Sequence, residues 1–523
     1  MGKRIVVNVG VTETRLAVQD GTSLTELHVE RARRRSIVSN IYKGVVTNVL
    51  PGMQAAFVDV GLGKDAFLYA GDYTENLGEE EGAPAGDNGG EPGSEPDDEP
   101  DVDVADDAAE ARAPAVPGAP IEQLLARGKE ILVQVSKESL GSKGARITSF
   151  ISLPGRYIVF MPQARHVGVS RRITDQAERE RLRDIVKELK PGSGGGFIVR
   201  TVAQGLGAAE LGADIEFLSR LWSQIQSRVE SARAPALLHE EGDLLFRAIR
   251  DLFSADVEEL LVDSRAGYDK AQQLATTLVP ALAGRVRWYS ERTPIFETTG
   301  IEREIERALR RRVWLKSGGY IVIDHTEALV SIDVNTGKYV GKRDFEETVL
   351  KINLEAAAEA MRQIRLRDLG GLIVVDFIDM ERADHREQVS RAVQRALAED
   401  KARTNVLPIS ELGLVEMTRK RARQDLEAVF HAACPTCRGS GKIKSDATLA
   451  AEIFRKVQAT AGGPEGQEVV VRVHPELAHH LDTVDRDALG RLETLVGAPV
   501  AVQAASGLSR EEYEVAWRVK GGA

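Results

Sequence analysis

The chain has 523 residues, of which 42% are hydrophobic and 28% charged, with a formal net charge of −11. This length is too great for a single hydrophobic core and indicates about three to five domains. No run of about twenty apolar residues occurs, and the N-terminus lacks an apolar stretch with a cleavage site, so we expect neither a membrane span nor secretion. The two cysteines exclude a disulfide framework, and a cytoplasmic protein is expected.

The negative charge is concentrated in one segment. Residues 72–120 contain sixteen acidic residues against Arg112 alone, a net charge of −15, so the rest of the chain carries +4. The segment has almost no large apolar residues and is predicted to be a disordered insertion. It could compete with RNA for a basic surface, or it could be a tolerated insertion.

The first third of the chain has the pattern of a small β-barrel. Residues 1–35 alternate apolar and polar residues as short strands do, and from residue 36 short strands alternate with glycine-rich turns up to the acidic insertion and again after it. Barrels of this kind bind single strands by stacking bases on aromatic rings, here Phe57 and Phe67, with Lys137, Lys143 and Arg146 along the phosphates. Both phenylalanines could instead belong to the barrel core. Through GVVTNVLPGMQAAFVDVG and ILVQVSKE, the block resembles the S1 RNA-binding domain.

Residues 150–245 alternate strands with charged helices. Arg200 and Thr201 leave one of these strands together. A planar guanidinium and a neutral hydroxyl are suitable donors for a terminal phosphate. On its own, this pair does not define a site.

Two apolar strands with acidic residues lie between residues 329 and 380. LVSIDVN places Asp333 and Asn335 on one face, and GLIVVDFIDM contains Asp376. A helix predicted over residues 346–369, closed by Gly370 and Gly371 as a C-cap, connects them, so we expect parallel strands with the carboxylates at one end. The two carboxylates would share a cation, or one would be a cap and the other hydrogen-bonded. Asp379 is left out, since three residues further along a strand it would face away from Asp376.

The two cysteines stand in the sequence HAACPTCRGSG. Cys434 and Cys437 are spaced to chelate one ion, although a structural zinc needs four ligands. Either two chains contribute two cysteines each, or the pair is redox-active, for which no thioredoxin-like βαβ pattern is evident around it. His431 is a further candidate ligand within one chain.

GMQAAFVDVG, VSIDVN, LIVVDFIDM and CPTCRGSG, in this order, resemble the catalytic core of the ribonuclease E/G family. The resemblance implies a multidomain α/β and α+β fold. An S1-type OB barrel is inserted in an RNase H-like subdomain, followed by a 5′-sensor, a DNase I-like catalytic domain, a zinc link and a small C-terminal domain. The implied ranges are 1–35 and 246–309 (RNase H-like), 36–150 (barrel), 151–245 (5′-sensor), 310–430 (catalytic), 431–445 (zinc link) and 446–523 (oligomerisation).

The resemblance also implies roles for individual residues. Asp333 and Asp376 would bind a catalytic Mg²⁺, with Asn335 supporting them. A pocket for a 5′-monophosphate would consist of Gly155, Val159, Arg200, Thr201 and Arg403. RNA would be gripped by Phe57, Phe67, Lys137 and Lys143, while Val60 stands where some members have another aromatic residue.

Cys434 and Cys437 would share a zinc ion between two chains of a homodimer, and the C-terminal domain would pair dimers. We do not expect the long tail that ribonuclease E uses to scaffold a degradosome, and in layout the chain resembles ribonuclease G or a short E-type member of the family.

The expected function is that of a magnesium-dependent endoribonuclease. It would cut single-stranded, AU-rich RNA, respond to a 5′-monophosphate, leave 5′-phosphate and 3′-hydroxyl ends, and act in rRNA and tRNA processing and mRNA decay. The alternatives are a non-catalytic RNA-binding regulator with structural aspartates and a thiol redox protein.

Overall fold

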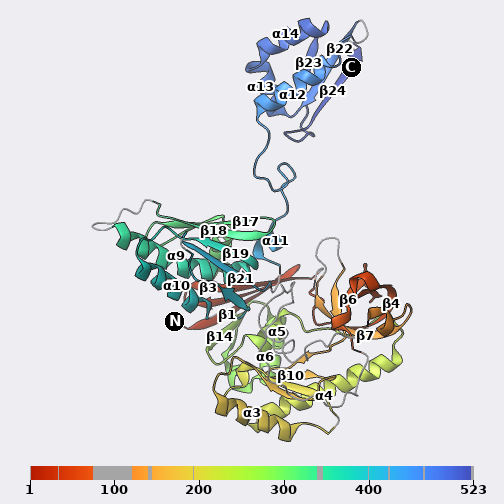
Figure 1. The fold of residues 1–523 in the computed structure, drawn as a ribbon, viewed down its shortest axis with the longest axis vertical. Coiled ribbons are helices and arrows are strands. Elements are labelled where there is room, and N and C mark those ends of the chain that lie inside the picture. The colour runs from red at the N-terminus through yellow and green to blue at the C-terminus, as the bar shows by residue number, and fades with distance from the viewer. Residues whose placement is uncertain are drawn as a thin grey trace. The chain divides into compact units, whose positions relative to one another are not determined.

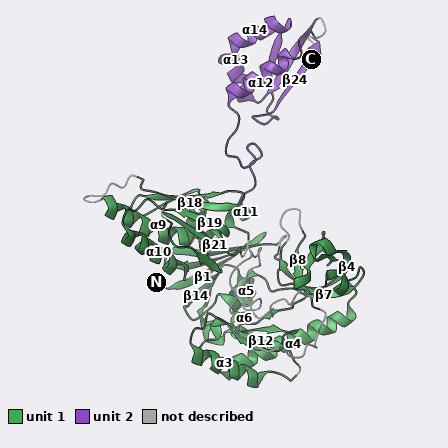
Figure 2. Cartoon of the chain, viewed as in Figure 1, with its two compact units in different colours: residues 1–429 green, residues 430–523 purple. Residues whose placement is uncertain are grey.

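A computed structural model describes residues 2–32, 35–74, 120–138, 144–192, 194–337, 345–398, 400–410, 412–421, 424–462 and 466–519. The chain divides into two compact units, residues 1–429 and 430–523 (Figure 2). In the part of the chain that is described, no helix is long and apolar enough to cross a membrane. Nearly all of the predicted acidic insertion, residues 75–119, lies outside the described residues.

A five-stranded closed barrel forms the first part of unit 1 beyond the N-terminal strands. Its strands follow the order β4-β5-β6-β8-β7, and β4 pairs again with β7 to close the ring, while β13 extends it beside β4. Alternate residues such as Val58, Leu68 and Val133 fill the interior. The elements are β4 (Ile41–Leu50), η1 (Pro51–Met53), β5 (Ala55–Asp59), β6 (Ala66–Tyr69), η2 (Ala70–Asp72), α2 (Ile121–Leu124), β7 (Glu130–Lys137), β8 (Arg146–Thr148) and β13 (Ala236–His239).

A second sheet joins segments that are far apart in sequence. Its order is β15-β14-β1-β2-β3, with β1 parallel to β14 and antiparallel to β2. Residues 3–31 thus share one sheet, and one hydrophobic core, with residues 257–288. The elements are β1 (Lys3–Val9), β2 (Glu13–Asp20), β3 (Ser23–Arg31), α5 (Leu244–Asp251), β14 (Val257–Val262), α6 (Arg265–Leu278), η4 (Pro280–Arg285), β15 (Val286–Trp288), α7 (Ile295–Thr298) and α8 (Ile301–Ala308).

A four-stranded sheet of order β11-β12-β10-β9 follows the barrel in sequence. Helices α3 and α4 bury an apolar stripe against it, with Leu182, Leu211 and Leu218 fully buried. The elements are β9 (Leu153–Pro154), β10 (Ile158–Met161), β11 (Val167–Val169), α3 (Gln176–Leu189), β12 (Gly196–Val199), η3 (Thr201–Ala203) and α4 (Ala208–Ser231).

The strands predicted to carry the carboxylates lie in the middle of a six-stranded sheet of order β16-β17-β18-β19-β21-β20. Ile332, Ile373 and Val375 point into the core formed with α9 and α10, which lie together on one face of the sheet (Figure 1). The elements are β16 (Arg312–Trp314), β17 (Tyr320–His325), β18 (Leu329–Asn335), α9 (Phe345–Arg367), β19 (Gly371–Asp376), α10 (Ala383–Leu397), β20 (Thr404–Val406), β21 (Leu414–Arg419) and α11 (Leu426–Phe430).

The expected parallel pairing of β18 and β19 is confirmed, but the expected end of the connecting helix is wrong. Helix α9 ends at Arg367, and Asp368 occupies the left-handed region at φ 55°. The N–H of Leu369 then bonds to the carbonyl of Ile364, which completes the cap. A non-glycine residue is held there because the Asp368 carboxylate accepts from Arg419 at 2.8 Å, and Gly371 instead begins β19.

Unit 2 contains a three-stranded sheet of order β23-β22-β24, in which β22 and β23 are parallel. Two helices connect the parallel strands, so a βαβ unit follows the cysteine pair. The expectation that no such unit accompanies the cysteines is therefore wrong. The unit begins only at Gln467, thirty residues after Cys437, so the sequence around the cysteines did not indicate it. The elements are α12 (Asp446–Gln458), β22 (Gln467–Val473), α13 (Pro475–Thr483), α14 (Arg486–Val496), β23 (Val500–Ala504) and β24 (Tyr513–Val519).

Candidate active site

Asp333 and Asp376 lie directly opposite each other on the adjacent parallel strands β18 and β19. Side chains alternate between the faces of a strand, so the buried neighbours Ile332 and Val375 place both carboxylates on the face away from α9. Both aspartates are exposed. The Asn335 amide donates to Asp333 Oδ2 at 2.7 Å and fixes that carboxylate. The geometry thus brings together the three residues expected at the catalytic centre.

The electrostatics of this pair favour a cation. The pKa of Asp376 is raised above its usual value, first by partial burial and then by the charges of Asp333 and Asp379. Carboxylate and amide oxygens are suitable ligands for Mg²⁺, which is commonly held by one or two carboxylates and retains several waters. Among the described residues, no group of three or more Asp, Glu, His or Cys side chains is arranged to hold a metal. The two carboxylates in register are a donor set that fits a Mg²⁺ which keeps several waters.

The reason for excluding Asp379 is wrong. Strand β19 ends at Asp376, so the alternation of a strand does not apply three residues later. Asp379 is exposed, and its charge contributes to the raised pKa of Asp376. It is therefore an additional carboxylate near the pair.

Helix α9 holds the turn that follows β19. The fully buried Asn353 donates to the carbonyl of Ile378 at 2.8 Å and accepts from its N–H at 3.1 Å, and Glu346 accepts from the N–H of Glu381. Asn353 was not among the expected site residues. An asparagine within the apolar stripe of a helix was the available signal, because a buried amide needs polar partners.

Four residues of the expected 5′-phosphate pocket lie around one strand end. The Arg200 guanidinium donates to the carbonyl of Gly155 at 2.8 Å and pairs with Asp251 at 2.8 Å, and it is only 6% exposed. Thr201 shares a hydrogen bond of 3.2 Å with the hydroxyl of Ser170. Val159 is buried in β10, where its side chain packs against Met161 and Ile198, so its backbone is the part that could serve a phosphate pocket.

Arg403 is exposed just before β20, on another sheet. The loop that precedes it is connected to the 5′-pocket region, because Arg172 donates to the carbonyl of Lys401. Arg172 is two residues beyond Ser170, the partner of Thr201. The structure thus links the two loops, while no hydrogen bond or ion pair joins Arg403 to the other four residues, all of which lie in the described part of the chain.

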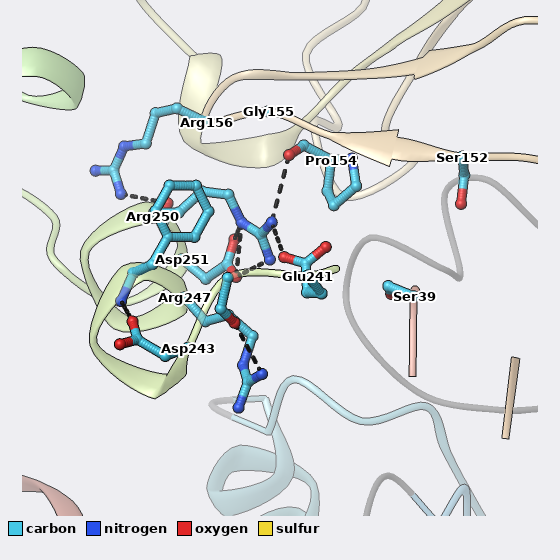
Figure 3. A network of polar contacts seen from close by, with 12 residues as sticks. Ser39, Ser152, Pro154, Gly155, Arg156, Glu241, Asp243, Arg247, Arg250 and Asp251 are labelled. Carbon is cyan, nitrogen blue, oxygen red and sulfur yellow. Dashed lines mark hydrogen bonds and ion pairs between the residues drawn. The ribbon is translucent and has the colours of Figure 1, made fainter. Parts of the chain in front are cut away.

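A buried network of ion pairs contacts the turn that contains Pro154 and Gly155 (Figure 3). Arg250 is 4% exposed, pairs with Asp251 at 2.8 Å and with Glu241, and donates to the carbonyl of Pro154 at 3.4 Å. Burial opposes the ionisation of Asp251, but the charges of Arg250 and Arg200 outweigh it and hold the pKa of Asp251 well below its usual range. The turn before β10 is therefore fixed to α5 by charge-assisted contacts.

Only glycine fits at position 155. A Cβ atom there would lie 2.5 Å from the Asp214 carboxylate, which accepts from the N–H groups of Arg156, Tyr157 and Ile158. This carboxylate occupies the inner side of the turn, so the backbone of Gly155 must pass close to it. Close packing against the Asp214 carboxylate thus explains why the expected pocket has a glycine at this position.

Phe57 and Phe67 lie opposite each other on β5 and β6, with ring centroids 5.5 Å apart. Both are half-buried. The exposed Tyr69, two residues after Phe67 on the same face, continues the row at 4.7 Å, and Arg146 lies 4.7 Å over its ring. Tyr69 was not expected, although its alternation with Phe67 was the available signal.

The basic residues of the barrel are only partly described. Lys137 on β7 is in register with Arg146 on β8, and Arg146 pairs with Asp72 at 2.8 Å. Lys143 lies outside the described residues. Val60, at the position where some members have another aromatic residue, is 2% exposed and belongs to the barrel core.

The cysteine pair lies at the start of unit 2. Cys434 is exposed and Cys437 half-buried, with both thiols free, and His431 is exposed. The N–H groups of Cys437 and Thr436 lower the pKa of Cys434. This turn favours the thiolate, the form that binds metal, and it offers two ligands of the four that a structural zinc needs.

Comparison with known proteins defines the class. The sequence model of the Ribonuclease E/G family matches residues 152–422, and that described as "RNase E/G, Thioredoxin-like domain" matches residues 433–518. The chain belongs to the ribonuclease E/G family and is an endoribonuclease of RNA processing.

Individual relatives cover nearly the whole chain. Ribonuclease G of Escherichia coli (strain K12) is 41% identical over 98% of this chain and 99% of its own length. Ribonuclease G of Haemophilus influenzae is 39% identical over 98% of each. Ribonuclease E of Escherichia coli (strain K12) is 36% identical over 94% of this chain and 44% of its own length.

Proposed function

We propose that this endoribonuclease cleaves single-stranded RNA with a Mg²⁺ held by Asp333 and Asp376. The observation that carries the proposal is the register of the two carboxylates on one exposed sheet face, with Asn335 bonded to Asp333. When bound, Mg²⁺ supplies Lewis acidity at the phosphate and lowers the pKa of a water nucleophile. Attack of this water on phosphorus would break the bond to the 3′ oxygen, which leaves and takes up a proton, giving 5′-phosphate and 3′-hydroxyl ends.

The protein's own residues position the reaction. Asn335 fixes one carboxylate, and Asn353 holds the turn after Asp376, so the oxygens are oriented before substrate arrives. The pKa of Asp376 is raised first by partial burial and then by the charges of Asp333 and Asp379, so the two carboxylates also repel each other when no cation is bound. Binding of a divalent ion would relieve this repulsion.

The RNA would reach this centre through two further contacts. The row of Phe57, Phe67 and Tyr69 offers stacking surfaces that tolerate any base. Gly155, Val159, Arg200, Thr201 and Arg403 would receive a 5′-monophosphate. Because Arg200 is already paired with Asp251, its remaining donors and the Thr201 hydroxyl would contact the phosphate. Preference for AU-rich RNA and a role in rRNA and tRNA processing and mRNA decay are part of the same proposal.

The thiols of Cys434 and Cys437 would bind zinc together with the same pair of a second chain, giving a homodimer that can pair into a tetramer. We place the enzyme in the cytoplasm. Zinc content near one ion per two chains, and dissociation of the dimer in Cys434→Ser, are the expected results. One zinc per chain, or a dimer unaffected by the substitution, would contradict the shared site.

A cleavage assay on matched 5′-monophosphate and 5′-hydroxyl RNAs, with Mg²⁺ or EDTA, tests the catalytic proposal. Cleavage only with Mg²⁺, and faster on the 5′-monophosphate RNA, is expected. Binding of RNA without cleavage under every metal condition would contradict the catalytic proposal, since the row of Phe57, Phe67 and Tyr69 could still bind RNA.

A further inference from the structure

A second exposed aromatic group lies on the hairpin of β16 and β17. Trp314 is 60% exposed, and its ring lies 5.2 Å from that of Tyr320 at an interplanar angle of 62°. The guanidinium carbon of Arg312 lies 4.4 Å from the centroid of the Tyr320 ring and 5.9 Å from that of the Trp314 ring. Two rings and a cation therefore form one cluster on the sheet.

The rings lie in one cross-strand row with a residue of the candidate active site. Trp314 on β16 is opposite Tyr320 on β17, and Tyr320 is opposite Asn335 on β18. Residues directly opposite each other project from the same face of a sheet. The aromatic pair thus shares the exposed face of Asn335.

The cation lies in the neighbouring row, which contains the carboxylates. Arg312 is opposite Val322, Val322 is opposite Asp333, and Asp333 is opposite Asp376. Strands lie about 4.8 Å apart, so Arg312 is roughly 10 Å from Asp333 along the sheet. This distance is short enough for adjacent nucleotides of one strand to reach both.

Folding alone does not account for this cluster. Burial of Trp314 contributes little, because most of its surface remains in water. Among the described residues Arg312 makes no ion pair, whereas the adjacent Arg311 pairs with Asp324 on the same sheet. The cluster therefore offers a positive charge beside two aromatic faces.

We propose that Trp314, Tyr320 and Arg312 form a binding site for a nucleotide of single-stranded RNA close to the bond that is cleaved. An aromatic ring stacks on an unpaired base, and a guanidinium can contact the neighbouring phosphate while it stacks. The site extends the proposed function and rests on its assignment of the carboxylates. The sequence RVWLKSGGYIV contained the signal, an aromatic residue on each side of a Ser-Gly-Gly turn.

The site can be tested by measuring RNA affinity under conditions in which no RNA is cleaved. A labelled 5′-hydroxyl oligoribonucleotide of about twelve nucleotides is titrated with the full chain in EDTA, and anisotropy reports binding. Trp314→Ala should weaken binding about tenfold. Trp314→Phe, which retains a ring, should stay within about twofold of the wild type.

Trp288 provides a matched control. It is 45% exposed and lies 5.1 Å beneath Arg265, but it belongs to the sheet of β14 and β15. Trp288→Ala should leave the affinity unchanged. Equal affinity of Trp314→Ala and the wild type, or equal losses in Trp314→Ala and Trp288→Ala, would overturn the proposal.

Sedimentation velocity on the same proteins separates RNA binding from a protein contact. An unchanged affinity with a changed oligomeric state in Trp314→Ala would show that the cluster binds another copy of the chain, and would also overturn the proposal. Failure of the proposed function is detected separately, because it would appear as cleavage that survives in Asp376→Asn. The affinity measurement in EDTA does not depend on that outcome.

Discussion

Asp333 and Asp376 face each other across the parallel pair β18 and β19, and no positively charged side chain of the described residues is bonded to either carboxylate. Two like charges at adjacent positions repel, and part of the cost appears as the raised pKa of Asp376. A protein tolerates such a pair when a cation is bound between the carboxylates for part of its working cycle.

Replacing one of the two carboxylates should stabilise the metal-free protein. A carboxyl whose pKa is raised on folding destabilises the fold once it is ionised, and protonation removes this effect as the pH falls. Asp333→Asn should therefore raise the melting temperature at pH 7 in EDTA. The gain in the free energy of unfolding should be less than about 1 kcal/mol, because the site is exposed. The gain should disappear at low pH, and added Mg²⁺ should stabilise the wild type only. A lower melting temperature for the variant in EDTA would contradict this account of the repulsion.

Asn353 should act on catalysis through the turn that it holds. Asn353→Leu leaves the N–H and carbonyl of Ile378 without their partner, at a cost of about 1–3 kcal/mol. We expect the Mg²⁺ concentration for half-maximal cleavage to rise and kcat to fall about tenfold, since positioning is lost. Asn353→Asp can still accept from the N–H of Ile378, so its Mg²⁺ requirement and its kcat should lie between those of the wild type and of Asn353→Leu. Unchanged Mg²⁺ dependence in a folded Asn353→Leu protein would exclude this role.

Asp251 should contribute to both stability and recognition of the 5′ end. Asp251→Asn removes the partner of two buried guanidinium groups, Arg250 and Arg200, and should cost about 3 kcal/mol. The pKa of Asp251 is lowered on folding, so its contribution is complete above the ordinary carboxyl pKa of about 4 and is lost as the pH falls further.

Chemical denaturation as a function of pH measures this contribution. The same variant should reduce the preference for 5′-monophosphate RNA, because Arg200 is no longer held. Asp256→Asn is the control, as its ion pair with Lys3 is at the surface and should be worth less than about 1 kcal/mol. Equal stabilities of the two variants at pH 7 would contradict the importance of the buried network.

Tyr69 should contribute to the affinity of the barrel for RNA. Tyr69→Ala removes the exposed end of the aromatic row, and we expect RNA affinity to fall about fivefold to tenfold. The exposed Met53, on the same barrel but outside the row, is the control for loss of surface area. If Met53→Ala weakens binding as much as Tyr69→Ala, stacking on Tyr69 is not the cause.

The local part of the catalytic centre could be predicted from the sequence. Strand alternation placed Asp333 and Asn335 on one face, and the intervening helix made parallel pairing with the strand of Asp376 the simplest arrangement. The register that sets Asp333 opposite Asp376 could not be read, because it depends on the packing of α9 against both strands.

Contacts between residues far apart in the sequence account for most of the remaining differences between the sequence-based predictions and the structure. The helix stops at Asp368 rather than at the glycines because Arg419, fifty-one residues later, holds its carboxylate. The sequence indicated that the Arg200 guanidinium is available to a terminal phosphate, but in the fold it is paired with Asp251. The hairpin of Trp314 and Tyr320 was missed because its first strand has only three residues, too few for a recognisable alternation.

The most direct test of the account is cleavage of a 5′-monophosphorylated single-stranded RNA by Asp376→Asn in saturating Mg²⁺, with Asp324→Asn as the control. Asp324 lies on the same sheet but is paired with Arg311. We predict that Asp376→Asn lowers kcat by at least about a hundredfold with RNA affinity unchanged, while Asp324→Asn cleaves as the wild type does. Cleavage by Asp376→Asn at the wild-type rate would contradict the assignment of this carboxylate to catalysis.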